Sequence, residues 1–178
     1  EALALGLKVI AALPMPRKLY AEDFAAGAER EHFLALCARA SEFIELPFTP
    51  GNTAGLSREP GYNRDRQYAQ LGVFLSAHCH VLLALWDGKA SDLLGGTAAT
   101  IQFHHHDVMP GYTPRVTSSK LNLTEDESDL VYHIVCSRDR PDGEPAPGLK
   151  PFETYWFTTD EANPRTAEIS ARHRKVFE

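Results

Sequence analysis

The chain has few cysteines and no net positive charge, and each of these features excludes a class of protein. Its three cysteines, Cys37, Cys79 and Cys136, are widely spaced inside apolar segments, which is typical of reduced core thiols rather than of a disulfide or zinc framework. The net charge of −6 and the pI near 5.7 argue against general binding to DNA or RNA, because that binding needs a dense Lys and Arg surface. We therefore expect a protein of a reducing compartment, in the cytoplasm.

Long apolar runs, internal repeats and low-complexity tracts are also missing. No stretch of about eighteen apolar residues and no charged-then-apolar leader occurs, so nothing in the sequence predicts a membrane span or secretion. At 178 residues and 43% apolar, the chain is long enough to bury a sizeable core. We expect one main domain.

Short apolar runs alternate along the chain with segments of helical periodicity. The runs predict strands, and the periodic segments predict helices. Gly27 can divide the first of these helices into two pieces. This alternation is the signature of βαβ units, whose right-handed crossovers make the strands parallel, so the sequence predicts an α/β fold. The expected strands are 8–13, 41–46, 80–87 and 131–136, and the expected helices are 21–40, 64–79 and 97–107.

The remaining segments predict the domain boundaries. Residues 1–140 are expected to form the main domain, and 141–178 to form a linker, rich in Pro and Gly at first, followed by the start of a helical extension. Residues 1–5 resemble the last turns of a helix, so we expect the domain to lack its first strand and helix. The long segment 47–62 is expected to be a loop over the site.

The segment 80–97, HVLLALWDGKASDLLGGT, carries the clearest functional signal. Ligands of open parallel sheets bind at the carboxyl ends of the strands. Gly95, Gly96 and Thr97 would open a helix there and leave backbone N–H groups free for an anion. The alternative is a tight loop in which Thr97 is an ordinary N-cap.

Further candidate ligand contacts follow the strands. The strand 80–87 ends with Trp86 and Asp87, followed by Gly88. The Trp86 ring could stack on a base and the Asp87 carboxylate could bind ribose hydroxyls. The alternatives are that Asp-Gly is a plain turn and that the tryptophan belongs to the core. Three arginines could neutralise phosphate charge, namely Arg17, Arg64 and Arg138. Arg64 lies at the start of an expected helix and could instead be an ordinary surface charge there.

The run of histidines 104–106 followed by Asp107 raises the question of a metal site. On a helix only His104 and Asp107 have the spacing that brings side chains together, and two ligands do not make a closed site. No Ser or Cys has a His and an acid at a recognisable spacing. The sequence therefore predicts no metal ligand and no catalytic residue.

Four segments in order, LPMPRKLYAEDF, RDRQYAQLG, HVLLALWDG followed by GGTA, and VYHIVCSRDR, resemble a bacterial sensor-type branch of the SLOG superfamily. That superfamily joins the Smf/DprA proteins, the LOG phosphoribohydrolases and sensor-like domains related to TRPM channels. The resemblance implies a Rossmann-like, mostly parallel sheet with helices on both faces and a nucleotide-type ligand near Gly95 to Thr97. The LOG enzymes carry a glutamate that, when the two Gly-Thr pairs are aligned, falls at Thr100.

The resemblance makes a binding domain the favoured function. We expect it to sense a nucleotide or nucleotide-derived second messenger, to act on an effector domain of a larger bacterial, antiviral or stress-response protein, and to form a homo-oligomer. No other cofactor is expected. The alternative is a LOG-like hydrolase that cleaves the N-glycosidic bond of a nucleoside 5′-monophosphate, with Asp87 or Asp65 in the role that a threonine cannot fill.

Overall fold

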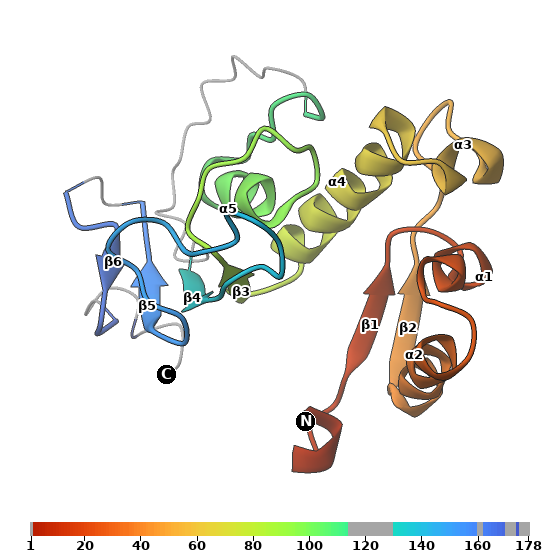
Figure 1. Cartoon of the computed structure of the whole chain (residues 1–178), viewed down its shortest axis with the longest axis horizontal. Helices are drawn as coiled ribbons and strands as arrows, with labels where there is room; N and C mark the ends of the chain where they lie inside the picture. Colours follow the sequence, from red (N-terminus) through yellow and green to blue (C-terminus); the bar gives the residue numbers. More distant parts are fainter. Residues whose placement is uncertain (1, 114–129, 160–161, 170–173, 175–178) are drawn as a thin grey trace. The chain divides into compact units, whose positions relative to one another are not determined.

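The computed structural model describes residues 2–113, 130–159, 162–169 and 174 (Figure 1). The chain divides into two compact units, Glu1–Leu71 and Gly72–Glu178. The division falls inside one helix and differs from the boundary at residue 140 that the composition predicts. The structure confirms a mixed α/β chain, and the strands of the described ranges form two small sheets.

The first unit begins with a βαβ arrangement. Its two strands pair in parallel, from Ile10 opposite Glu42 to Leu13 opposite Glu45, as the alternation of elements predicts. Gly27 has a φ of 96°, a conformation that glycine adopts at little cost, and it divides the predicted helix 21–40 into two pieces. In chain order the elements are η1 (Ala2–Leu5), β1 (Ile10–Leu13), α1 (Arg17–Tyr20), η2 (Ala21–Asp23), α2 (Ala28–Arg39), β2 (Glu42–Glu45), α3 (Ala54–Arg58) and α4 (Tyr62–Ala77), which continues into the second unit.

A buried glutamine fixes the segment that the sequence predicts to be a long loop. Gln67 is fully buried, and its Oε1 accepts hydrogen bonds from the Thr49 N–H at 2.7 Å and the Asn52 side chain at 3.1 Å. Its Nε2 donates to the Pro14 carbonyl at 2.8 Å. The segment also contains α3, which is capped by the Thr53 hydroxyl, so it is partly helical and firmly attached to the first unit.

The second unit contains a four-stranded mixed sheet in the order β3-β4-β5-β6. β3 and β4 are parallel, from Val81 opposite Leu130 to Trp86 opposite Val135, whereas β4–β5 and β5–β6 are antiparallel. The expected mostly parallel sheet is therefore not confirmed, because the chain returns after β4 without a crossover helix. The elements are β3 (Val81–Trp86), α5 (Thr97–His106), β4 (Leu130–Val135), β5 (Thr154–Phe157) and β6 (Arg165–Thr166).

The carboxyl-terminal segment differs from its prediction. We expected a linker and then a helix from Thr166, but β5 and β6 lie in this range and Thr166 ends a strand. A four-residue strand and a two-residue strand are too short to produce a clear period in the sequence. Most of the expected helix after Thr166 lies outside the described residues.

The core of the second unit lies between α5 and one face of the sheet. Its buried members include Ala84, Trp86 and Ile101, with Phe157 packed against them. On the opposite face of β3, Leu83 and Leu85 are each 68% exposed, so the apolar run does not have both faces covered as predicted. No helix in the described ranges is both long and apolar enough to cross a membrane.

Candidate functional site

A cavity of about 290 Å³ lies at the carboxyl end of β3 and the amino end of α5. It brings together five residues that the sequence singles out as ligand contacts from three separate segments: Trp86, Asp87, Gly96, Thr97 and Arg138. All five belong to the second unit. The cavity also takes in Leu85, Ser91, Leu93, Ala98 and Cys136.

The Gly-Gly-Thr segment forms the amino terminus of α5. Gly95 has a φ of 76°, and Gly96 is the N-cap with an extended backbone and no capping side chain. The prediction that Thr97 caps the helix is therefore wrong by one residue, and Thr97 is the first helical residue. The first N–H groups of a helix have no partner within it, so the end of α5 at the cavity provides donors and a partial positive charge.

The two charged residues of the cavity form an ion pair with each other. Oδ2 of Asp87 lies 2.6 Å from Nε of Arg138, and the Asp87 side chain is only 1% exposed, against 33% for Arg138. Oδ1 of Asp87 accepts a hydrogen bond from the Lys89 N–H at 3.1 Å. Both carboxylate oxygens are thus engaged, so Asp87 positions Arg138 at the cavity, a role that its spacing in the sequence does not reveal.

Trp86 and Gly88 have strong structural reasons for their identity. Trp86 is 7% exposed and belongs to the core, and its Nε1 donates to the Lys89 carbonyl at 3.0 Å. Gly88 has a φ of 79°, and a Cβ at this position would collide with Leu149. Trp86 presents only a small part of its ring to the cavity, so its predicted role as an open stacking plate is limited to that part.

Arg17 and Arg64, the other predicted phosphate ligands, lie in the first unit and have partners there. The Arg17 guanidinium lies 4.7 Å from the centre of the Phe43 ring. Arg64 pairs with Asp23 and donates to the Ser57 carbonyl at 2.6 Å. The Tyr68 hydroxyl donates to the same Asp23 carboxylate at 3.0 Å, and burial raises the pKa of Tyr68 to about 12.

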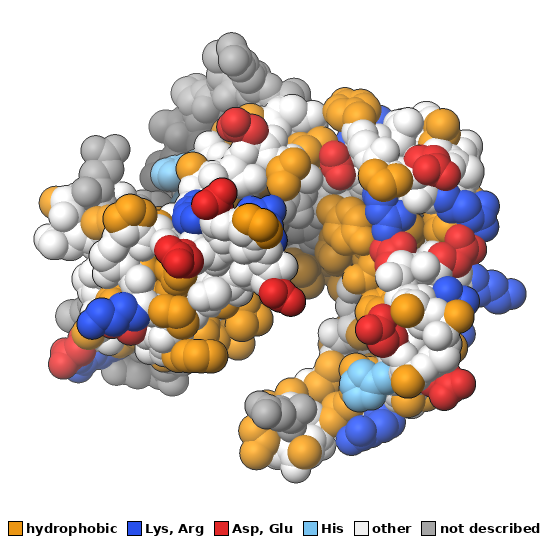
Figure 2. All heavy atoms as spheres, in the orientation of Figure 1, with side chains coloured by type: hydrophobic (Ala, Val, Ile, Leu, Met, Phe, Trp, Pro, Cys, Tyr) orange, Lys and Arg blue, Asp and Glu red, His pale blue; other side chains and the backbone are white. Residues whose placement is uncertain are grey.

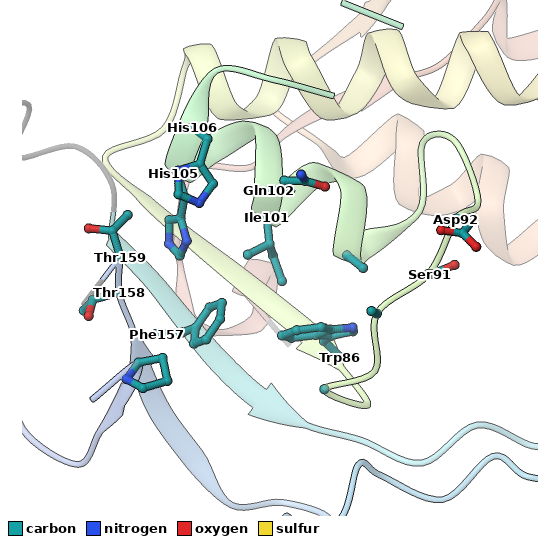
Figure 3. A pocket seen from close by; sticks show the side chains of 14 residues that line it. Trp86, Ser91, Asp92, Ile101, Gln102, His105, His106, Phe157, Thr158 and Thr159 are labelled. Atoms are coloured by element: carbon teal, nitrogen blue, oxygen red, sulfur yellow. The ribbon is translucent and has the colours of Figure 1, made fainter. Parts of the chain in front are cut away.

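A larger cavity, of about 550 Å³, lies between α5 and β5 (Figure 3). Sequence reasoning missed it, although its wall on α5 has the spacing of a single helical face, at residues 98, 101, 102, 105 and 106. Trp86 and Phe157 contribute aromatic rings, and the loop after β3 contributes Ser91 and Asp92. The helical spacing was the available signal, but the partner strand β5 was not predicted.

A buried histidine holds the end of β3 that lies beside the cavities. His133 of β4 is fully buried, and its Nε2 lies 3.0 Å from the Trp86 carbonyl oxygen, which assigns the proton to Nε2. Burial lowers the pKa of His133. The neutral ring therefore fixes the carboxyl end of β3 next to Asp87.

Thr100, the position that aligns with the LOG glutamate, faces α4. Its hydroxyl donates to the Gly96 carbonyl at 3.1 Å. A Cβ on Gly72 would lie 2.5 Å from the Thr100 oxygen, so the two helices are in close contact at this point. Thr100 therefore serves helix packing in this structure.

A third cavity, of about 420 Å³, gathers imidazole, thiol and carboxyl groups near the carboxyl ends of α4 and α5. Its lining includes His78, Cys79, His80, His104 and Asp107. Among the residues that the structure describes, no group of three or more His, Cys, Asp or Glu side chains has a geometry that could hold a metal ion. Burial raises the pKa of the Cys79 thiol, which disfavours the reactive thiolate.

The two cavities beside α5 offer different chemical groups to a ligand. The smaller cavity offers helix N–H groups and a guanidinium, and the larger offers aromatic and amide groups. Lys and Arg side chains lie among Asp and Glu side chains on the face drawn in Figure 2, in keeping with the net charge of −6. Comparison with known proteins finds no family model, no curated protein and no solved structure that matches this chain significantly.

Proposed function

We propose that the chain is a Rossmann-like, SLOG-type domain that binds a nucleotide or a nucleotide-derived second messenger. The observation that carries the proposal is that Gly96, Thr97 and Arg138, each predicted as a phosphate contact from its sequence context, line one cavity of about 290 Å³. The parallel pair β3 and β4, with α5 between them in sequence, supports the Rossmann-like part of the proposal.

The local electrostatics of the cavity favour an anion. The end of a helix macrodipole and the first free N–H groups attract negative charge. Nε of Arg138 lies 2.6 Å from Oδ2 of Asp87, and a guanidinium has five N–H donors, which is more than one carboxylate oxygen can accept from. The buried carboxylate holds the guanidinium in place before the ligand arrives, which reduces the entropy lost on binding.

The wider role follows from the resemblance. Binding would change the contact of this domain with an effector domain of a larger bacterial protein, and the assembly would be a cytoplasmic homo-oligomer.

The hydrolase alternative has weaker support from the residues at the cavity. Its remaining acid there is Asp87, whose two oxygens are engaged by Arg138 and by the Lys89 N–H. Incubation of the protein with nucleoside 5′-monophosphates and chromatography of the products for free base tests it. We expect no base above the level of a protein-free control, whereas release that is lost in Asp87→Asn would favour the enzyme.

A charge introduced at Thr97 tests the binding function without harming the fold. Thr97 is exposed in the first turn of α5, where a carboxylate stabilises the helix but repels a bound phosphate. The matched control is Ala28→Glu, which adds the same charge at the first, exposed residue of α2.

The assay is a thermal-shift screen with adenosine monophosphate, a cyclic dinucleotide, ADP-ribose and inorganic pyrophosphate. We expect at least one compound to raise the melting temperature of the wild type and of Ala28→Glu, and to have no effect on Thr97→Glu. No shift with any compound for the folded wild type, or an unchanged shift in Thr97→Glu, would refute the proposal.

A further inference from the structure

We propose that the cavity between α5 and β5 binds the nucleobase of the ligand whose phosphate lies at Gly96 and Thr97; this inference rests on the proposed function. The ligand class is then a nucleoside phosphate with its base along α5, and not a sugar phosphate or a free polyphosphate.

The two cavities are adjacent, because they share part of their lining. Trp86, Ser91 and Ala98 line both of them. A phosphate at the amino end of α5 therefore leaves the rest of a ligand beside the larger cavity. From residue 98 to residue 106 the helix beside that cavity rises by eight residue steps, which is about 12 Å at the usual helical rise and enough for a base and its ribose.

The floor of the larger cavity suits a flat, neutral ring. Phe157 and Trp86 lie with their ring centres 5.7 Å apart and pack with Ile101 of α5, and Phe157 is the more exposed of the two rings that line the cavity (Figure 3). The guanidinium of Arg165 lies 4.9 Å from the Phe157 ring centre and 5.8 Å from that of Trp86, which holds both rings in position. All four nucleobases can stack on such rings, because each base has a π-face.

The polar groups at the rim suit the hydrogen-bonding edge of a base. Asp92 and Gln102 are exposed and lie on the side of the cavity away from Phe157 (Figure 3). A carboxylate accepts hydrogen bonds from an exocyclic amino group, and an amide both donates and accepts. Among the described residues the lining contains one carboxylate and neither Lys nor Arg.

Calorimetric titration separates the base from the phosphate. The probes are the 5′-monophosphates of adenosine, guanosine, cytidine and uridine, with ribose 5-phosphate as the probe that lacks a base. For the wild type we expect at least one nucleoside monophosphate to bind about tenfold or more tightly than ribose 5-phosphate, as the loss of one stacked base implies.

Two substitutions place the base. Phe157→Leu removes the ring but keeps an apolar side chain, and we expect it to weaken the nucleoside monophosphate about tenfold and leave ribose 5-phosphate unchanged. The matched control is Phe152→Leu, the same change at a side chain that is 88% exposed and outside both cavities, which should change neither. Gln102→Ala, at an exposed helix position, should weaken the nucleoside monophosphate about fivefold through one lost hydrogen bond.

The outcomes distinguish this inference from the proposed function. Equal affinity for all five probes would overturn the base site and leave the phosphate site standing. Tighter binding of a nucleoside monophosphate that neither Phe157→Leu nor Gln102→Ala weakens would overturn the placement of the base. No binding of any of the five probes by the wild type would overturn the inference, whereas the proposed function would fall only if the cyclic dinucleotide, ADP-ribose and pyrophosphate of the thermal-shift screen also gave no shift.

Discussion

Removing the Arg138 guanidinium should cost much more stability than removing an exposed partner of another ion pair. The Asp87 carboxylate is 1% exposed and lies 2.6 Å from Arg138 Nε, so Arg138→Met leaves a buried charge without its partner. Loss of one partner from a buried pair costs about 3–5 kcal/mol, and we expect about 3 kcal/mol here because the Arg138 side chain is one-third exposed. The matched control is Arg174→Met, which breaks the pair with Glu168 in the same unit, whose side chains are 61% and 88% exposed, and should cost at most about 1 kcal/mol.

The assay is urea unfolding followed by tryptophan fluorescence. Both tryptophans, Trp86 and Trp156, lie in the second unit, so the signal reports the unit that contains the Asp87–Arg138 pair. Asp87→Asn combined with Arg138→Met should recover part of the loss, because the double variant buries no unpaired charge. A cost of Arg138→Met below about 1 kcal/mol, or no recovery in the double variant, would refute the account of this pair.

Three further predictions concern the fold. Gly72→Ala should lower the midpoint of urea unfolding despite the higher helix propensity of Ala, because the new Cβ would lie 2.5 Å from the Thr100 oxygen. Adding Thr100→Ala should restore the midpoint, and a gain in stability from Gly72→Ala alone would contradict this contact. Burial lowers the pKa of His133, so the unfolded state binds the proton more readily than the folded state. The contribution of His133 to the free energy of unfolding is therefore complete above about pH 6.5 and should fall as the pH drops below that value. Equal midpoints of urea unfolding at pH 7.5 and 5.5 would argue against this effect. Gln67→Ala should leave the Thr49 N–H buried without its acceptor, cost about 1–3 kcal/mol and accelerate hydrogen exchange at that amide, whereas unchanged exchange would show that the bond is unimportant.

The sequence predicted the βαβ arrangements because their signals are local. The apolar runs at β1 to β4 and the helical stripes between them are each visible within a short window, and the break at Gly27 follows from one residue type. β5 was missed because its place in the sheet depends on antiparallel pairing with β4, which lies well before it in the chain, and β6 because two residues are too few to show a period of their own. The same dependence hid the larger cavity, which needs Phe157 of β5 opposite α5.

The sequence predicted which residues lie at the candidate site but not which of them contact each other. Asp87 and Arg138 were each expected to contact a ligand, and the structure shows that they contact each other. Their pairing depends on the register that sets Trp86 opposite Val135, which brings the ends of β3 and β4 together. Register is a property of the folded sheet, so residue spacing alone could not reveal that Asp87 pairs with Arg138, one of the predicted phosphate contacts.

The most direct test of the proposed function is an NMR titration of the isotope-labelled protein with the nucleotide that gives the largest thermal shift. The account predicts that the backbone amide signals of Gly96, Thr97 and Ala98 move most, together with the side-chain signal of Arg138, and that they do not move in Thr97→Glu. Shifts confined to other residues, or no shift at the amino end of α5 at saturating nucleotide, would contradict it.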